Sequence, residues 1–213
     1  GTAVAVLLAA CSSGPGSSPA PAASGSDGAQ PDGCPASQPA PLGAGETRTV
    51  TIATALGDII LRIDADLSPI AAGNFVALAS CGWYDGVVFH RVVPGFVIQG
   101  GDGQFGRIDA FDPAQVGTGG PPYTIQDEAV TATYRRGTVA MARTPAPNSV
   151  GSQFFVVLDD AAAASLADPQ YNNHQIIGEV TSGMDTVDAI ARSADAELPS
   201  RPVAMDDVTV TQP

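Results

Sequence analysis

The sequence predicts a mostly β domain with two helices, preceded by a long N-terminal segment with little apolar surface to bury. Residues 48–55 (RTVTIATA) alternate apolar and polar side chains. After the Gly57-Asp58 turn, residues 59–63 form a second strand-like run, which is typical of a β-hairpin. Later apolar runs are short and are separated by Gly and Pro. We expect strands within 87–102, 123–126, 137–143, 151–157, 172–180 and 208–210.

Two segments have helical spacing. The first begins at Ser68-Pro69, where Ser suits the N-cap and Pro suits the first helical position. Its apolar residues recur three and four positions apart, as on one helix face. The second helix is expected around residues 184–191. The spaced apolar residues are Ala71, Phe75, Leu78 and Ala79 in the first helix, and Met184, Val187, Ile190 and Ala191 in the second.

The N-terminal residues indicate targeting and a tether. Residues 1–11 are apolar, too short to span a bilayer, and typical of the end of a signal peptide. Their last four residues, Leu-Ala-Ala-Cys, resemble the bacterial lipobox, which predicts lipidation of Cys11; the alternative is an ordinary signal peptide with a chance Cys. Residues 12–46 are rich in Ser, Gly, Pro and Ala, which predicts a disordered tether. The folded domain is expected over residues 47–213.

The three cysteines indicate in which kind of cellular compartment the protein resides. If Cys11 is lipidated, Cys34 and Cys81 remain as a pair. In an oxidising compartment we expect them to form a disulfide that ties the tether to the domain; the alternative is two free thiols. The Cys and His spacing does not match a metal site, so no metal is expected.

Charge excludes some partners. The formal charge is −13, the pI is about 4.1, and all nine basic residues are arginine. Such a chain lacks the basic footprint that binds nucleic acid or anionic lipid, so we expect no nucleic-acid partner and membrane attachment only through a lipid anchor. The acidity favours solubility.

The segment 87–102 is central, because polar groups interrupt two apolar runs joined at Pro94-Gly95. Pro and Gly suit the two middle positions of a tight turn. Arg91 is unexpected inside such a run, since it keeps its charge and has five donors in a rigid fork. Burying it requires a partner, such as Gln99 or an acid. The alternative is an edge-strand Arg that extends to water.

Several motifs resemble those of the cyclophilins, which are peptidyl-prolyl cis-trans isomerases. The resemblance covers about residues 47–213 and implies a closed eight-stranded antiparallel barrel capped by two helices. It also implies an isomerase of X–Pro bonds in exported proteins, without a cofactor. The matching motifs, in order, are Phe89-His90-Arg91, Pro94-Gly95-Phe96, Gln99-Gly100-Gly101-Asp102, Gly117-Thr118-Gly119-Gly120, Met141-Ala142 and Gly151-Ser152-Gln153-Phe154-Phe155, followed by a late strand containing His174.

This chemistry requires no nucleophile or acid–base pair. Resonance in the X–Pro amide gives a rotation barrier of about 18–20 kcal/mol. A catalyst must bind the twisted amide better than either planar isomer. In that state the prolyl nitrogen regains its lone pair, and a permanently charged, rigid donor such as Arg91 is suited to it.

The resemblance assigns roles residue by residue. It implies a catalytic set of Arg91, Phe96, Gln99, Phe155 and His174, in which Arg91 is the donor and the two Phe residues form walls of the proline pocket. For both Phe residues the alternative is core packing. The implied substrate-binding residues are Val97, Gly117, Ala142, Arg143, Thr144, Gln153 and Leu166.

Three departures from the family pattern affect these assignments. Arg143 replaces the usual Asn, with little expected loss because the family uses the backbone there. The loop at residues 145–147 is one residue longer than in the eukaryotic pattern. The family's pocket Trp has no counterpart; Leu166 is the best match for the adjoining Leu, and Trp83 lies elsewhere in the sequence. We therefore expect weak cyclosporin binding.

Two functional classes remain open at this point. The first is an isomerase lipid-anchored to the outer face of a bacterial cytoplasmic membrane or to the cell surface. The second is a peptide-binding chaperone or scaffold on the same fold, with little turnover. Retention of Arg91 favours the first, because a pure binder does not need a donor at the twisted nitrogen. A monomer is expected.

Overall fold

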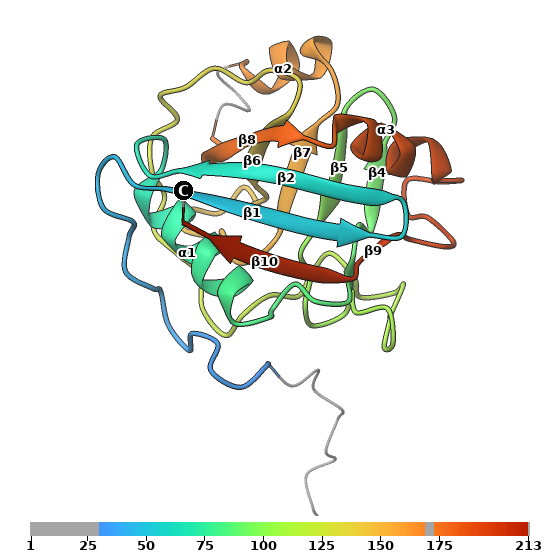
Figure 1. The fold of residues 1–213 in the computed structure, drawn as a ribbon, viewed down its shortest axis with the longest axis horizontal. Coiled ribbons are helices and arrows are strands. Elements are labelled where there is room, and N and C mark those ends of the chain that lie inside the picture. Colours follow the sequence, from blue (N-terminus) through green and yellow to red (C-terminus); the bar gives the residue numbers. More distant parts are fainter. Residues whose placement is uncertain (1–29, 169–172, 213) are drawn as a thin grey trace, which may run out of the picture.

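The structure is a computed structural model that describes residues 30–168 and 173–212. Its main element is an eight-stranded antiparallel sheet with the order β10-β1-β2-β8-β6-β7-β5-β4, and β3 pairs with β9 separately (Figure 1). The strands are β1 (Thr47–Thr54), β2 (Gly57–Asp64), β3 (Val87–Val88), β4 (Arg91–Val93), β5 (Val97–Gly100), β6 (Thr138–Met141), β7 (Phe154–Val157), β8 (Ile176–Ser182), β9 (Ala204–Met205) and β10 (Asp207–Thr211). The helices are α1 (Pro69–Ser80), α2 (Asp160–Leu166) and α3 (Met184–Ser193).

The sheet is curled but open, so the prediction of a closed barrel is wrong. Its edge strands, β4 and β10, do not pair with each other within the described ranges. The outer edge of β4 is occupied by the segment 194–203 instead. Val92 N–H donates to Glu197 C=O at 2.8 Å, and Phe89 N–H, just before β4, donates to Val203 C=O at 2.9 Å. Because this segment accepts from two backbone N–H groups along the edge, the edge is covered without closure.

The hairpin of β1 and β2 follows from the alternation of apolar residues. In β1 and β2, Val50, Ile52, Ile59, Leu61 and Ile63 are fully or almost fully buried, and their neighbours face outward. The turn between β4 and β5 also forms as predicted, with Gly95 at φ 70°. Residues 123–126, however, form no strand, and only Ile125 makes a bridge, to Val150.

The described ranges contain three helices, whereas the sequence predicted two. Helix α2 was missed because its run of alanines has no polar–apolar period. The Asp159 carboxylate caps it by accepting from Ala162 N–H at 2.8 Å. Figure 1 shows α1 and α3 near opposite ends of β2, and α2 beyond β8. No helix in the described part of the chain is long and apolar enough to cross a bilayer.

The start of α1 differs from the predicted cap. Pro69 occupies the first turn, but the Ser68 hydroxyl makes no capping bond. The Glu128 carboxylate, 58 residues away in sequence from Ile70, accepts from Ile70 N–H and Ala71 N–H, both at 2.9 Å. A carboxylate at this end also complements the helix dipole.

Residues 30–46 pack on the domain, although the sequence predicted disorder up to residue 46. Leu42 N–H donates to Pro69 C=O at 3.1 Å, and the Gln38 side chain accepts from Gln126 N–H at 2.9 Å. Cys34 and Cys81 form a disulfide, with sulfurs 2.01 Å apart. This bond joins the segment to the end of α1. Cys11 lies outside the described residues.

The buried apolar side chains form two clusters. The larger lies inside the curled sheet and includes Trp83 and Tyr84. The smaller lies on the other face of β5, β6 and β7 and includes Val97, Phe155 and Leu166. The second cluster is where the candidate site is found.

Candidate active site

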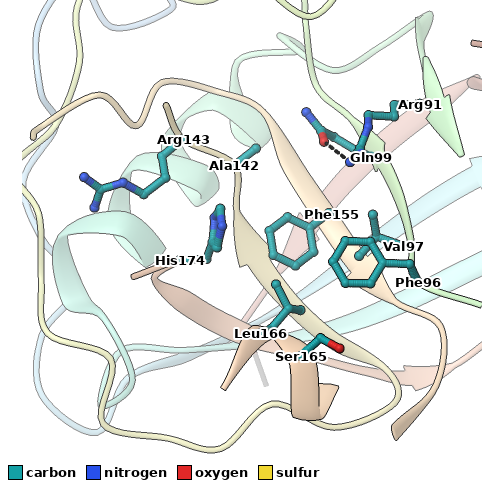
Figure 2. Close-up of a pocket in the computed structure, with 10 residues that line it drawn as sticks. All are labelled: Arg91, Phe96, Val97, Gln99, Ala142, Arg143, Phe155, Ser165, Leu166 and His174. Carbon is teal, nitrogen blue, oxygen red and sulfur yellow. Dashed lines mark hydrogen bonds between the residues drawn. The ribbon is translucent and has the colours of Figure 1, made fainter. Parts of the chain in front are cut away.

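A cavity of about 400 Å³ opens on the smaller cluster (Figure 2). It combines an apolar floor with polar groups at its rim. Its lining comes from β4, β5, β7 and α2, from the residue just before β5, from the residues just after β6 and from the residue two positions before β8. The lining residues are Arg91, Phe96, Val97, Gln99, Ala142, Arg143, Phe155, Ser165, Leu166 and His174.

The floor of the cavity is aromatic and aliphatic because β7 alternates. Phe154 points into the larger cluster, where it meets Phe75 edge to face, and Phe155 points into the cavity. Phe155 is 4% exposed and Leu166 is 5% exposed, and Phe96 is half-buried beside them. Figure 2 shows these rings turned toward a common space. A small apolar ring would fit against them.

Arg91 lies on β4 directly opposite Gln99 of β5. Its Nη1 donates to Gln99 Oε1 at 3.4 Å, and its Nε donates to Glu197 Oε1 at 2.6 Å. The side chain is still 38% exposed. Both partner types expected from the sequence, Gln99 and an acid, are therefore present, and the guanidinium stays at the cavity rim.

A chain of hydrogen bonds made by side-chain amides continues from Gln99 to a second cavity of about 400 Å³. Gln99 Nε2 donates to Gln153 Oε1 at 3.0 Å, and Gln153 Nε2 donates to the carbonyls of Gly117 and Gly119, each at 2.9 Å. The buried Asp102 carboxylate accepts from the N–H groups of the same two glycines. This loop is thus held on both sides.

The second cavity holds the predicted binding residues that the first does not. Gly117, Thr144 and Gln153 line it, while Gln99, Ala142 and Arg143 border both cavities. The two cavities therefore lie side by side, as neighbouring positions of an extended peptide would require.

Arg143 does not present a free charge to either cavity. Its side chain is 8% exposed and pairs with Asp127 at 2.9 Å. It also donates to the carbonyls of Ala146 and Asn173, at 3.0 and 3.2 Å. The Arg143 guanidinium therefore holds the following loop in place. The backbone and the aliphatic part of the side chain form the cavity wall.

His174 closes the far side of the first cavity. Its Nδ1 lies 3.2 Å from Met141 C=O, and because a carbonyl only accepts, Nδ1 carries the proton. Burial lowers the pKa of His174, and the charge of Arg143 lowers that pKa further, against the opposing effect of the Met141 bond. The Tyr134 hydroxyl donates to His174 C=O at 2.8 Å, and burial raises the pKa of Tyr134 to about 12.

Sequence reasoning missed two residues of this region. Ser165 precedes Leu166 on α2 and would have been found if that helix had been recognised. Glu197 lies 106 residues from Arg91, in a segment without a motif, and the sequence contains no signal for it. The described residues contain no cluster of three or more His, Cys, Asp or Glu side chains able to hold a metal.

The comparison that decides the family covers most of the chain. Residues 49–210 match the family described as cyclophilin type peptidyl-prolyl cis-trans isomerase/CLD. The chain belongs to the cyclophilin family. It is a peptidyl-prolyl cis-trans isomerase. In this cyclophilin, Arg91 lies at the rim of the apolar cavity.

Relatives and solved structures agree with this placement. A probable peptidyl-prolyl cis-trans isomerase of Brucella abortus is 43% identical over 151 residues, covering 70% of this chain and 74% of the relative. Peptidyl-prolyl cis-trans isomerase A of Dickeya dadantii is 31% identical over 177 residues, covering 80% and 88%. A cyclophilin type isomerase of Cryptosporidium parvum has a TM-score of 0.63 at 29% identity, covering 78% of this chain and 99% of its own. That protein was also solved in the presence of the dipeptide Ala-Pro.

Proposed function

We propose that this cyclophilin accelerates X–Pro rotation without covalent chemistry, with Arg91 donating a hydrogen bond to the prolyl nitrogen of the twisted amide. The observation that carries the proposal is the position of Arg91 at the rim of an apolar cavity. Its fork is held by Gln99 and Glu197, next to the rings of Phe96 and Phe155.

The geometry suits a division of labour. The proline ring would pack on Phe96, Phe155 and Leu166, and removal of these apolar surfaces from water would supply binding. The residues before proline would extend toward the second cavity, past Ala142 and Gln153. Binding the ring and the chain separately leaves the amide between them free to twist under Arg91.

Catalysis would come from a donor that is stronger in the twisted state. The planar amide nitrogen has no available lone pair, whereas the pyramidal nitrogen accepts a hydrogen bond. A fixed, charged donor at this position therefore favours the transition state over both ground states. The Ala-Pro dipeptide used with the Cryptosporidium relative suggests a simple substrate for this chain.

The test is two-dimensional NMR exchange on a short Ala-Pro peptide with wild-type protein and Arg91→Ala. We expect wild type to accelerate exchange and Arg91→Ala to lose most of that acceleration, by about 100-fold, in the range of one lost electrostatic donor. The matched control is Arg62→Ala, which removes an exposed, ion-paired arginine from β2. If the peptide binds and neither wild type nor variant changes exchange, the chain is a peptide-binding chaperone or scaffold.

We further propose that the protein is exported and lipid-anchored through Cys11 to the outer face of a bacterial cytoplasmic membrane or to the cell surface. The lipobox-like residues 8–11 and the pairing of Cys34 with Cys81 support this proposal. Palmitate labelling of the full-length precursor in a bacterial host tests it. Labelling and membrane fractionation should both be lost with Cys11→Ser; equal fractionation of the two proteins would contradict it.

Weak cyclosporin binding is also part of this proposal. The cavity wall that α2 supplies carries Leu166 and Ser165, and the only tryptophan, Trp83, is buried in the other cluster. A competition assay should find weaker inhibition than for Trp-containing cyclophilins, and equally tight inhibition would overturn this expectation.

A further inference from the structure

Glu197 is held next to Arg91 by the backbone as well as by its side chain. Its C=O accepts from Val92 N–H at 2.8 Å, which ties Glu197 to the residue after Arg91 on the edge strand β4. A second bond, from Phe89 N–H to Val203 C=O, fixes the same segment six residues later. The backbone bonds therefore already place the Glu197 carboxylate close to Arg91.

The segment is also closed on itself. Both Ser200 N–H and the Ser200 hydroxyl donate to the Asp195 carboxylate, one to each oxygen. Pro199, between them, is buried. Glu197 thus lies at the centre of a short loop that is pinned at its two ends and against β4.

The bond from Arg91 to Glu197 fixes the part of the side chain that Gln99 does not. Nε donates to Glu197 Oε1 at 2.6 Å, which is short for a charge-assisted bond, while Nη1 meets Gln99 at a longer 3.4 Å. Two donors held from different elements set the plane of a rigid fork. Arg91 Nη2 makes no hydrogen bond to any other described side chain or backbone group.

We propose that Glu197 is a positioning residue for catalysis, which sets the plane of the Arg91 guanidinium before the peptide binds. This inference rests on the proposed role of Arg91. A donor that is already oriented pays less reorganisation when the nitrogen becomes pyramidal, so Glu197 acts on turnover. An exposed ion pair adds little to stability, and Glu197 is 64% exposed, so its effect on folding is small.

The experiment compares Glu197→Ala, Glu197→Gln and the control Asp109→Ala. Asp109 is an exposed acid paired with Arg107 at 3.7 Å, so its removal changes the net charge equally. Peptide affinity is taken from an NMR titration, and turnover from exchange at saturating peptide. Glu197→Ala should lower turnover about fivefold, the upper range for one exposed charge pair, with affinity nearly unchanged. Glu197→Gln, whose amide oxygen still accepts from Nε, should recover most of the loss.

A double-mutant cycle separates positioning from a structural role. Lysine has no Nε–H fork, so Glu197→Ala should cost nothing further in the Arg91→Lys background. An equal loss in both backgrounds would overturn the inference, as would wild-type turnover in Glu197→Ala. If Arg91→Ala itself keeps full turnover, the proposed role of Arg91 fails instead, and this outcome is measured independently of the Glu197 variants.

Discussion

The rings of His174 and Phe155 meet edge to face in the first cavity, with centroids 5.2 Å apart and planes at 83°. The edge of one ring thus rests on the face of the other, a preferred arrangement for such pairs. The bond from Nδ1 to Met141 C=O fixes the imidazole in this position. His174 therefore acts as a neutral wall of the pocket, and its protonation would place a charge against an apolar floor.

Acidification should destabilise the protein between pH 7.5 and 5. Burial lowers the pKa of His174 and of His90, the two histidines of the chain, below the ordinary 6.5. Below pH 6.5 the unfolded chain binds more protons than the folded one, so stability falls with pH until the folded pKa values are passed. Urea unfolding at several pH values measures this.

The variant His174→Gln measures how much of the pH dependence of stability comes from His174 in the pocket. It should flatten the slope in part, because His90 remains. In wild type the acceleration of Ala-Pro exchange should fall in the same window. Stability that is constant or rises as pH falls from 7.5 to 5 would contradict burial of two neutral histidines.

Removing Asp127 should loosen the loop at residues 144–149. Asp127 pairs with the nearly buried Arg143, and the same carboxylate oxygen accepts from Asn148 N–H at 2.9 Å. Asp127→Ala leaves Arg143 without its charge partner, so we expect a loss of about 1–3 kcal/mol in unfolding free energy. Calorimetry or urea unfolding measures it, with Asp109→Ala as the exposed control. Equal stabilities of the two variants would argue against a stabilising role of the ion pair between Arg143 and Asp127.

The disulfide should matter for stability and not for turnover. Cys34 and Cys81 are 47 residues apart, and both pack on the larger cluster, away from the cavity floor. Cys34→Ser with Cys81→Ser should cost about 2–4 kcal/mol, chiefly by freeing the unfolded chain. Exchange rates measured well below the melting temperature should not change. A large loss of turnover at a temperature where the variant is folded would contradict this separation of the disulfide from the cavity.

Gly73 should resist replacement although it lies inside α1. A Cβ there would come within 2.4 Å of Ala40 C=O, because residues 40–42 cross the helix at this point. Alanine normally favours a helix over glycine by about 0.5–1 kcal/mol. We expect the clash with backbone to dominate, so that Gly73→Ala lowers the melting temperature. An increased melting temperature would mean that residues 40–42 do not lie against α1 in solution.

The local parts of this fold were predictable because their causes are local. Alternation gave the hairpin of β1 and β2, and Pro94-Gly95 gave the turn that places Arg91 opposite Gln99. Motif resemblance then indicated nine of the ten residues that line the first cavity. Each of these depends on neighbouring residues or on a motif of a few positions.

The parts that the sequence did not predict depend on partners far along the chain. Glu128 caps α1 from 58 residues away, Glu197 reaches Arg91 across 106 residues, and the segment 194–203 covers the edge of the sheet at β4. The order of residues 30–46 likewise depends on α1, since composition alone predicted disorder. Such contacts leave no period or motif in the sequence.

The most direct test of the central claim measures Ala-Pro exchange at saturating peptide for wild type and Arg91→Lys. Lysine keeps the charge but not the fork held by Gln99 and Glu197. We predict that peptide affinity changes less than about threefold, while the exchange rate in the complex falls at least about tenfold, because an unoriented donor stabilises the twisted nitrogen poorly. An unchanged exchange rate in Arg91→Lys would contradict the account, since charge alone would then be sufficient.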